Sequence, residues 1–111
     1  MMPDYKTLAE NYFQAFSRKD ITAVANMFER DVILTDWEIT AFGKEDVVKA
    51  NQKIFDSVDT IYVTPKDIYL DGQVIIAELR ILVNGKDEIK VVDIIHFNVR
   101  GEITSIKAYK G

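Results

Sequence analysis

Three tight-turn signals divide the second half of the chain into four strand-like segments. Asp71-Gly72 and Asn84-Gly85 are dipeptides typical of two-residue β-hairpin loops, and Arg100-Gly101 marks a third turn. The segments that they separate are rich in β-branched and aromatic residues and span residues 60–70, 73–83, 88–99 and 102–109. This half of the chain therefore predicts a meandering antiparallel sheet, with an edge position or a bulge at Pro65.

The first half of the chain predicts three helices and one strand. Asp4 can cap a helix that runs to about residue 18, with an apolar stripe of Tyr5, Leu8, Ala9, Tyr12, Phe13 and Phe16. Asp20 can cap a shorter second helix whose inner side carries Ile21, Val24, Ala25 and Phe28. Residues 32–38 predict a strand, a short second strand after them is left open, and Gly43 precedes a third helix over residues 44–57.

Because the helices come first and the strands follow one another, the layout predicts an α+β fold rather than an alternating α/β fold. With 111 residues, the chain is long enough for one domain and short for two, so we expect a single domain over residues 1–111. Hydrophobic residues make up 48% and charged residues 29%, which is ordinary for a soluble globular protein.

Composition excludes several classes of function. No cluster of lysine or arginine could follow a phosphate backbone, so we expect no nucleic-acid partner. The chain has no cysteine and one histidine, His96, so a multi-histidine or cysteine metal site is not expected. No apolar run approaches the roughly 18 residues of a membrane span, and the first residues lack the apolar core of a signal peptide. We therefore expect a cytoplasmic protein without a membrane partner.

A carboxylate lies in the middle of an otherwise apolar strand face. Alternate residues of a strand share a face, and one face of the segment 88–99 carries Ile89, Val91, Asp93, Ile95 and Phe97. Burial raises the pKa of a carboxyl group, because an unpartnered charge among apolar side chains is costly. Asp93 would then be neutral at pH 7 and able to donate a hydrogen bond. Two alternatives stay open: the face could be partly wet, or Asp93 could simply bond to a neighbouring hydroxyl.

Asp36 and Tyr12 are two further candidates. Val32 and Leu34 lead along one strand face to Asp36, which could stand as a carboxylate at the mouth of a pocket. Alternatively, Asp36 and the following Glu38 are solvated residues at a strand end. Tyr12 lies at the centre of the first apolar stripe, where a buried hydroxyl needs a partner. It could donate to a ligand, or it could be an ordinary core tyrosine.

The segment 73–83 predicts which sheet face lines a pocket. One face is wholly apolar and suits a pocket wall, with Ile75, Ala77, Leu79, Ile81 and Val83. The other face places Glu78 and Arg80 as a charge pair within an apolar row, which suits a subunit interface or an outer sheet surface. His96 lies on the face opposite Asp93, so we interpret it as a structural or interface residue. Trp37 is interpreted as a packing or rim residue.

The chain resembles ketosteroid isomerase and the SnoaL-like proteins of the NTF2-like superfamily over about residues 9–111. Tyr12 and the segments 31–36, 93–98 and 101–105 carry the resemblance. It implies a cone in which three helices pack on a curved, mainly antiparallel sheet around an apolar pocket. It also implies roles for three residues: Asp36 as general base, with Tyr12 and a protonated Asp93 as hydrogen-bond donors, as in ketosteroid isomerase. Asn51 stands where the isomerases have a supporting tyrosine, and Trp37 where they have proline.

The function implied by this resemblance is proton abstraction next to a carbonyl of a small hydrophobic substrate, giving isomerisation, cyclisation or dehydration without a cofactor or metal. We expect the ligand to be contacted by Trp37, Phe16, Val91, Ile95, Leu79 and Phe55. Relatives of this kind often form homodimers through the outer sheet face, which we also expect here. The alternative is a non-catalytic module that binds a small ligand or dimerises. An epoxide hydrolase would need an arginine in the pocket, and Arg80 is predicted to face outward.

Overall fold

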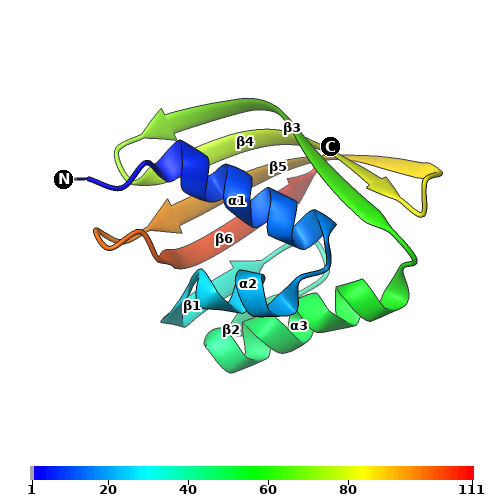
Figure 1. Cartoon of the computed structure of the whole chain (residues 1–111), viewed down its shortest axis with the longest axis horizontal. Coiled ribbons are helices and arrows are strands. Elements are labelled where there is room, and N and C mark those ends of the chain that lie inside the picture. The colour runs from blue at the N-terminus through cyan, green and yellow to red at the C-terminus, as the bar shows by residue number, and fades with distance from the viewer. Residues whose placement is uncertain (1) are drawn as a thin grey trace.

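One sheet of six strands and three helices make up the computed structural model, which describes residues 2–111 (Figure 1). The helices are α1 (Tyr5–Ser17), α2 (Ile21–Asn26) and α3 (Lys44–Ser57). The strands are β1 (Phe28–Thr35), β2 (Thr40–Phe42), β3 (Ile61–Asp71), β4 (Val74–Val83), β5 (Asp87–Phe97) and β6 (Ile103–Lys110). Their order in the sheet is β2-β1-β6-β5-β4-β3, and every neighbouring pair is antiparallel except β1 and β6, which are parallel. The α+β prediction is confirmed.

The helix starts follow from local capping. The Asp4 carboxylate accepts hydrogen bonds from the Thr7 backbone N–H at 3.2 Å and from the Thr7 hydroxyl at 2.9 Å. Asp20 accepts one from the Ala23 N–H at 3.1 Å. These bonds satisfy N–H groups that the first helical turn leaves free. Gly43 precedes α3 with a φ of 84°, a conformation that glycine adopts at little cost.

The hairpin predictions are also confirmed. Gly72 joins β3 to β4 with a φ of 63°, and Asn84 and Gly85 join β4 to β5 with φ values of 56° and 65°. Two successive positive φ values are typical of a type I′ turn, which the Lys86 N–H closes by donating to the Val83 carbonyl at 3.0 Å. Because Val83 pairs with Asp87, this connection has three residues, 84–86, rather than two. Pro65 lies on β3, the edge strand, where the register with β4 shifts between Pro65 and Asp67. A residue without an N–H is tolerated at such an irregularity.

Two predicted boundaries around β1 are wrong. Phe28 begins β1 instead of continuing the second helix, because its strand pairs in parallel with β6 at Ile103. The Met27 carbonyl accepts a hydrogen bond from the Ile103 N–H at 2.8 Å, which fixes this junction. At its other end β1 stops at Thr35, so Asp36 lies in a turn and not on the strand. The short strand left open by the sequence is present as β2.

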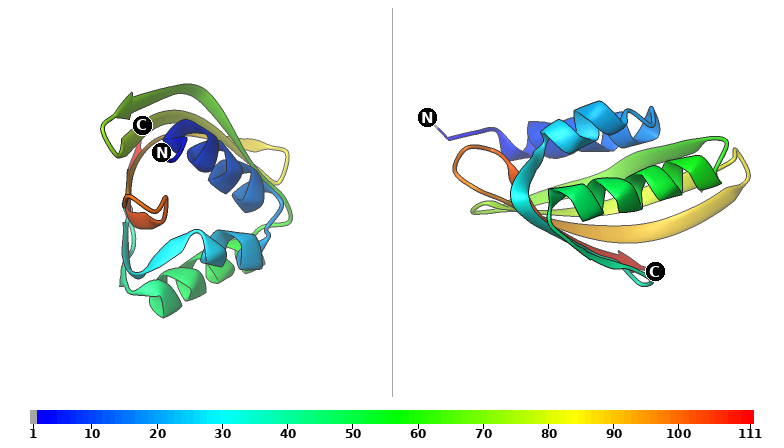
Figure 2. Two further views of the ribbon diagram at one scale, coloured as in Figure 1. Left: turned by 60° about the vertical axis from the view of Figure 1, so that its left-hand side comes forward. Right: turned by 90° about the horizontal axis from the view of Figure 1, so that it is seen from below.

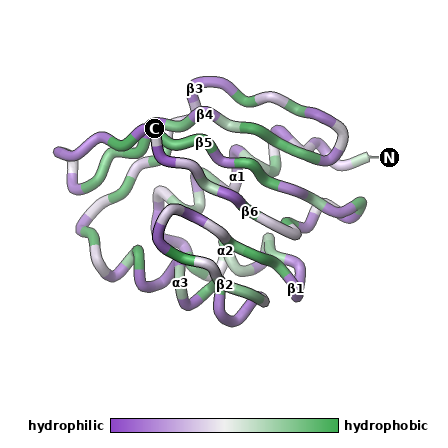
Figure 3. The backbone as a smooth tube through the Cα atoms, turned by 180° about the vertical axis from the view of Figure 1, so that it is seen from behind, coloured by the Kyte–Doolittle hydropathy of each residue, from purple (hydrophilic) through white to green (hydrophobic). Residues whose placement is uncertain are grey.

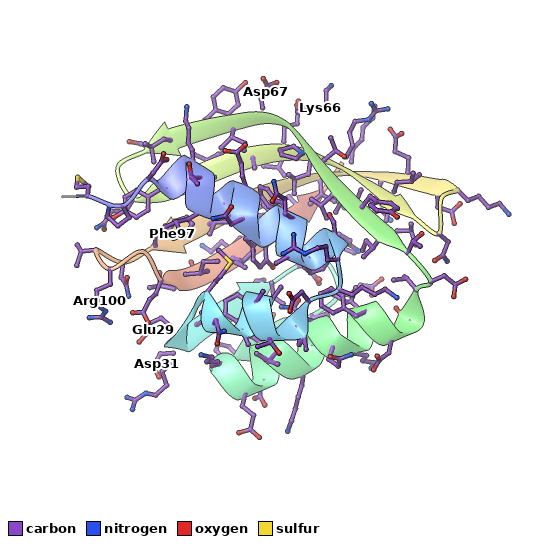
Figure 4. The ribbon with its side chains drawn as sticks, viewed as in Figure 1. Glu29, Asp31, Lys66, Asp67, Phe97 and Arg100 are labelled. Carbon is purple, nitrogen blue, oxygen red and sulfur yellow. The ribbon has the colours of Figure 1, made fainter. Side chains whose placement is uncertain are left out.

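The helices cover one face of the sheet and leave the other bare. α1 packs on β3 and β4, α3 packs on β1 and β2, and α2 contacts both other helices. The sheet bends around them, which gives the cone seen in Figure 2. At one end of the cone the rings of Tyr5 on α1 and Phe97 on β5 lie 5.2 Å apart, beside the start of α1 (Figure 4). No helix within residues 2–111 has both the length and the apolar character needed to cross a bilayer.

The strands alternate between hydrophobic and hydrophilic residues, as the view from behind in Figure 3 shows. The inner row of β4 is buried at Ile75, Ala77 and Leu79. Of the pocket wall predicted for this row, Leu79, Ile81 and Val83 line the cavity, whereas Ile75 and Ala77 pack in the core instead. On the outer face Arg80 pairs with Glu88, its guanidinium donating to both carboxylate oxygens at 3.0 and 3.2 Å. The predicted pairing of Arg80 with Glu78 is therefore wrong, because the diagonal neighbour on β5 lies closer to the guanidinium. The outward direction of Arg80 is confirmed.

Candidate functional site

A cavity of about 330 Å³ lies between α1, α3 and the inner face of the sheet. Its wall is mostly apolar, with side chains from every layer that include Phe16, Leu34, Ile54, Leu79, Ile81 and Val91. Four polar side chains interrupt this wall: Tyr12, Asp36, Asn51 and Asp93. The mouth is marked by exposed lining residues, namely Trp37, Glu38 and Lys110. A largely apolar pocket with a few converging polar groups is the usual form of a small-molecule site.

Two of the residues predicted to contact a ligand do not line this cavity. Ile95 is fully covered within the core on the side of the cone that Tyr5 and Phe97 close. Phe55 is also buried, and its ring packs against that of Phe16 at 4.8 Å in an edge-on arrangement. The other four, Trp37, Phe16, Val91 and Leu79, do line the cavity.

Asp93 projects into the cavity from the middle of β5. Its direct neighbours in the sheet are Ala77 on β4 and Ala108 on β6, and these small side chains leave the space that the carboxyl group occupies. The residue is only 8% exposed. Burial raises the pKa of Asp93 from its ordinary value of 3.8 to about 7, and the nearby charge of Asp36 adds to the rise. Near pH 7 and below, the carboxyl group can therefore carry a proton and donate a hydrogen bond.

Tyr12 reaches the cavity from α1. Its ring lies among three aromatic rings, those of Phe13, Phe16 and Phe28, at centroid distances of 5.8, 6.0 and 6.2 Å. Burial raises the pKa of the Tyr12 hydroxyl far above its ordinary value of 10.0, and the charge of Asp93 raises it further. The hydroxyl therefore keeps its proton and can act as a donor.

Asp36 stands in the turn that follows β1. One carboxylate oxygen, Oδ1, accepts hydrogen bonds from the backbone N–H groups of Glu38 and Ile39, both at 2.7 Å. The Asp36 N–H in turn donates to the Ile39 carbonyl at 2.9 Å. This closed turn fixes the direction of the side chain, as aspartate commonly does in turns. The carboxylate lines the cavity on the side of the mouth, beside Trp37 and Glu38.

The structure thus brings Tyr12, Asp36 and Asp93 to one cavity. They come from a helix, a turn and a strand that lie far apart in the sequence. Their proximity has an electrostatic signature, since the charge of Asp36 raises the pKa of Asp93 and the charge of Asp93 raises that of Tyr12. The apolar space can hold a carbonyl compound whose oxygen accepts hydrogen bonds from Tyr12 and from the protonated Asp93. The fixed carboxylate of Asp36 can then remove a proton from that compound.

Two polar residues of the lining were given no role from the sequence, although the resemblance aligns Asn51 with the supporting tyrosine of the isomerases. Asn51 is 2% exposed, and its Nδ2 has no hydrogen-bond partner within residues 2–111. Its signal in the sequence was its four-residue spacing from Val47 and Phe55, which form one buried face of α3. Lys110 lines the mouth, where its Nζ lies 5.9 Å from the centre of the Trp37 ring. Nothing in the strand pattern distinguished Lys110 from other exposed lysines.

No group of three or more histidine, cysteine, aspartate or glutamate side chains suited to a metal ion occurs within the described residues 2–111.

Comparison with known proteins gives a consistent fold. The sequence profile of the SnoaL-like domain matches residues 9–106. A candidate SnoaL-like polyketide cyclase from Shewanella denitrificans shares 15% identity at a TM-score of 0.87, covering 98% of this chain and 91% of that one. A candidate ketosteroid isomerase from Kribbella flavida shares 17% identity at a TM-score of 0.85, covering 99% of this chain and 79% of that one. An NTF2-like protein of unknown function from Cytophaga hutchinsonii shares 16% identity at a TM-score of 0.83, covering 100% of this chain and 93% of that one.

These similarities concern the architecture. The helices on a curved sheet correspond to the NTF2-like cone, as expected from the resemblance. At such low identity the solved structures show the fold alone. No curated protein matches the sequence significantly.

Proposed function

Because the chain belongs to the SnoaL-like domain family, we propose that its cavity performs acid–base chemistry of the ketosteroid-isomerase kind on a small hydrophobic carbonyl compound. The observation that supports this most is the placement of Asp93 in the apolar wall, together with Tyr12 and Asp36 around the same space. A protonated acid and a phenol are two donors that a carbonyl oxygen can use. A carboxylate with a fixed direction is the base that the adjacent C–H bond requires.

In the proposed reaction the Asp36 carboxylate removes a proton from the carbon next to the carbonyl. The electron pair of the C–H bond forms a carbon–carbon double bond, and the carbonyl electrons move to oxygen to give an enolate. The Tyr12 hydroxyl and the protonated Asp93 donate hydrogen bonds to that oxygen. Asp36 then returns its proton to another carbon of the conjugated system, which completes an isomerisation.

The cavity provides the conditions that make such groups effective. A base positioned next to its proton contributes about 10² to 10⁴ in rate, and an oxyanion donor about 10² to 10³. Hydrogen bonds to an enolate are stronger where water is excluded, and most of this wall is apolar. The direct test is exchange of α-protons of small cyclic enones with D₂O, followed by proton NMR. Exchange should exceed that in buffer alone, and equal rates would contradict the proposal.

Tyr12→Phe should weaken the binding of phenols, which resemble the enolate in shape and, when ionised, in charge. Loss of one hydrogen bond to a partly charged oxygen is expected to raise Kd about tenfold. The affinity can be measured by isothermal titration calorimetry. Tyr62→Phe removes a hydroxyl from an exposed residue of β3 and should leave Kd unchanged. Equal affinities of wild type and Tyr12→Phe would show that the Tyr12 hydroxyl does not contact the ligand.

The alternative of a non-catalytic binding or dimerisation module is favoured by the bare outer face of the sheet. Residues paired directly across the strands share this face, and Ile33, Phe42, Tyr69 and Tyr109 on it are exposed. Glu78 and Lys107 lie on the same face, and neither forms an ion pair within residues 2–111. In a two-fold dimer one acid and one base on the same surface can pair reciprocally. We propose that this face binds a second copy of the chain.

Ile76→Glu should therefore dissociate the dimer. Ile76 lies in the middle of the outer face, between Tyr69 and Ile94, and a buried unpaired charge at an interface is strongly unfavourable. Sedimentation equilibrium should show twice the 12.7 kDa chain mass for wild type and a dissociation constant at least about tenfold higher for the variant. Gln14→Glu adds the same charge on the exposed side of α1 and should leave the dimer intact. A monomeric wild type would contradict this proposal and leave the pocket chemistry untouched.

A further inference from the structure

Among the buried polar groups of the cavity lining, the amide of Asn51 is the one for which the proposed chemistry has no use. Asn51 lies in the middle of α3 and is 2% exposed. Its Nδ2 has no acceptor anywhere within residues 2–111. Buried side-chain donors nearly always have a partner, because leaving one unpaired costs the full desolvation of the group. An unpaired donor in the wall of a cavity therefore points to a ligand that enters the cavity and carries a hydrogen-bond acceptor.

Packing alone does not require an amide at this position. The residues one turn away on the same face of α3, Val47 and Phe55, are apolar and buried. Leucine has the same number of side-chain heavy atoms as asparagine and the same branching at Cγ, and it carries no donor that needs a partner. The amide is therefore a cost to stability that a function of the pocket would explain.

Asn51 reaches the cavity from a different wall than the oxyanion donors do. The rings of Phe16 on α1 and Phe55 on α3 touch at 4.8 Å, which joins the two helices. Tyr12 lies one turn before Phe16, and Asn51 lies one turn before Phe55. The cavity therefore has Tyr12 on its α1 wall, Asn51 on its α3 wall and Asp93 on the sheet.

We propose that the Asn51 amide donates a hydrogen bond to a second oxygen of the ligand, so that the substrates are small hydrophobic molecules with two oxygen functions. This inference rests on the proposed function: one oxygen is the carbonyl held by Tyr12 and Asp93, and the other is a neutral acceptor such as a ketone, ester or hydroxyl. A neutral group fits because, among the described lining residues, the only cation is Lys110 at the exposed mouth. Rotation about χ2 can turn Nδ2 to the ligand and breaks no hydrogen bond of that atom.

The test uses phenols in matched pairs that differ by one ketone oxygen. The pairs are meta-ethylphenol and meta-hydroxyacetophenone, para-ethylphenol and para-hydroxyacetophenone, and para-butylphenol and para-hydroxybenzylacetone. Dissociation constants are measured by calorimetry for wild type, Asn51→Leu and, as a smaller replacement that leaves no steric conflict, Asn51→Ala. For each pair the quantity of interest is the ratio of the two constants, in which general effects of the mutation cancel.

For the pair whose length fits the cavity, the Kd of the ketone divided by the Kd of the alkylphenol should rise about fivefold in both Asn51 variants. This is the effect of losing one neutral hydrogen bond. Without ligand, Asn51→Leu should melt at a higher temperature than wild type. Ile54→Val, which trims an apolar lining residue, should weaken both members of a pair equally. Unchanged ratios in all three pairs, with phenols still bound, would overturn the role of Asn51 alone. Failure of every phenol to bind wild type would overturn this inference and the proposed function together.

Discussion

Asp36→Asn is expected to lower the rate of α-proton exchange by about 10³-fold while changing the Kd of phenols by no more than a few fold. The amide cannot accept the substrate proton, and loss of a general base typically removes about 10² to 10⁴ in rate. The turn should survive, because the amide oxygen can still accept the hydrogen bonds that Oδ1 receives from the Glu38 and Ile39 N–H groups. Proton NMR in D₂O measures the exchange, and calorimetry measures the binding.

Glu38→Gln is the matched control for this experiment. Glu38 is the neighbouring acid at the mouth of the cavity and is exposed, so its neutralisation should leave the rate within about twofold. If Glu38→Gln abolished exchange while Asp36→Asn retained it, the base would be Glu38. If both variants kept the wild-type rate, neither acid at the mouth would take the proton.

The second large effect concerns stability, which should fall as the pH rises from about 4 to about 7 because of Asp93. The pKa of Asp93 is about 7 in the folded protein and near 3.8 in the unfolded chain. In this window the folded state holds a proton that the unfolded state has released, so raising the pH favours unfolding. The full difference corresponds to on the order of 4 kcal/mol, at about 1.4 kcal/mol for each pKa unit. Above pH 7 the loss should level off.

Asp93→Asn should remove this dependence, because the amide does not titrate. Urea denaturation of wild type and variant at pH 5 and pH 8 gives the free energies of unfolding. The free energy of unfolding of the variant minus that of wild type should rise by about 2 to 3 kcal/mol from pH 5 to pH 8. Any effect of the substitution that does not depend on pH adds the same amount to this difference at both pH values. Asp67→Asn, on an exposed aspartate that projects away from β3 (Figure 4), should leave the wild-type dependence unchanged. Parallel pH profiles for wild type and Asp93→Asn would mean that Asp93 is not desolvated.

The sequence predicted the elements whose signals are local. Alternation along β5 placed Asp93 on an apolar face, and the helical spacing around Tyr12 placed it on the inner side of α1. The inward row of β4 and the outward direction of His96 follow from the same two-residue period. Each of these features depends on neighbours within one helix or strand, so the pattern of a single segment suffices.

Features set by distant partners were not predicted. Phe28 continues the apolar pattern of α2, and only its pairing with Ile103 makes it a strand residue. The end of β1 was placed too late because nothing in the alternation shows that Asp36 bonds to its own turn. Ile95 fits the pocket face as well as Val91 does, but only the contact of Tyr5 with Phe97 shows where the cavity ends.

The burial of Asn51 is the clearest case of a feature that local patterns do not predict. Asn51 stands among Lys49, Gln52 and Lys53, and such a polar stretch of helix is typical of a solvated surface. Its burial depends on how α3 is turned against the sheet, which the apolar residues Val47 and Phe55 determine. That its Nδ2 has no hydrogen-bond partner among residues 2–111 can be seen only once all surrounding atoms are placed.

The parallel pairing of β1 with β6 has a consequence for how the chain acquires its structure. Phe28 pairs with Ile103, 75 positions later (103 minus 28), and β6 also supplies the other edge of β5. During synthesis, β1 and β5 leave the ribosome before β6 does. The backbone N–H and C=O groups along the edges that β6 will occupy therefore stay unpaired until residues 103–110 follow. Contacts between such distant segments form slowly. The nascent chain therefore depends on β6 to close the sheet, and it is most exposed to aggregation just before β6 emerges.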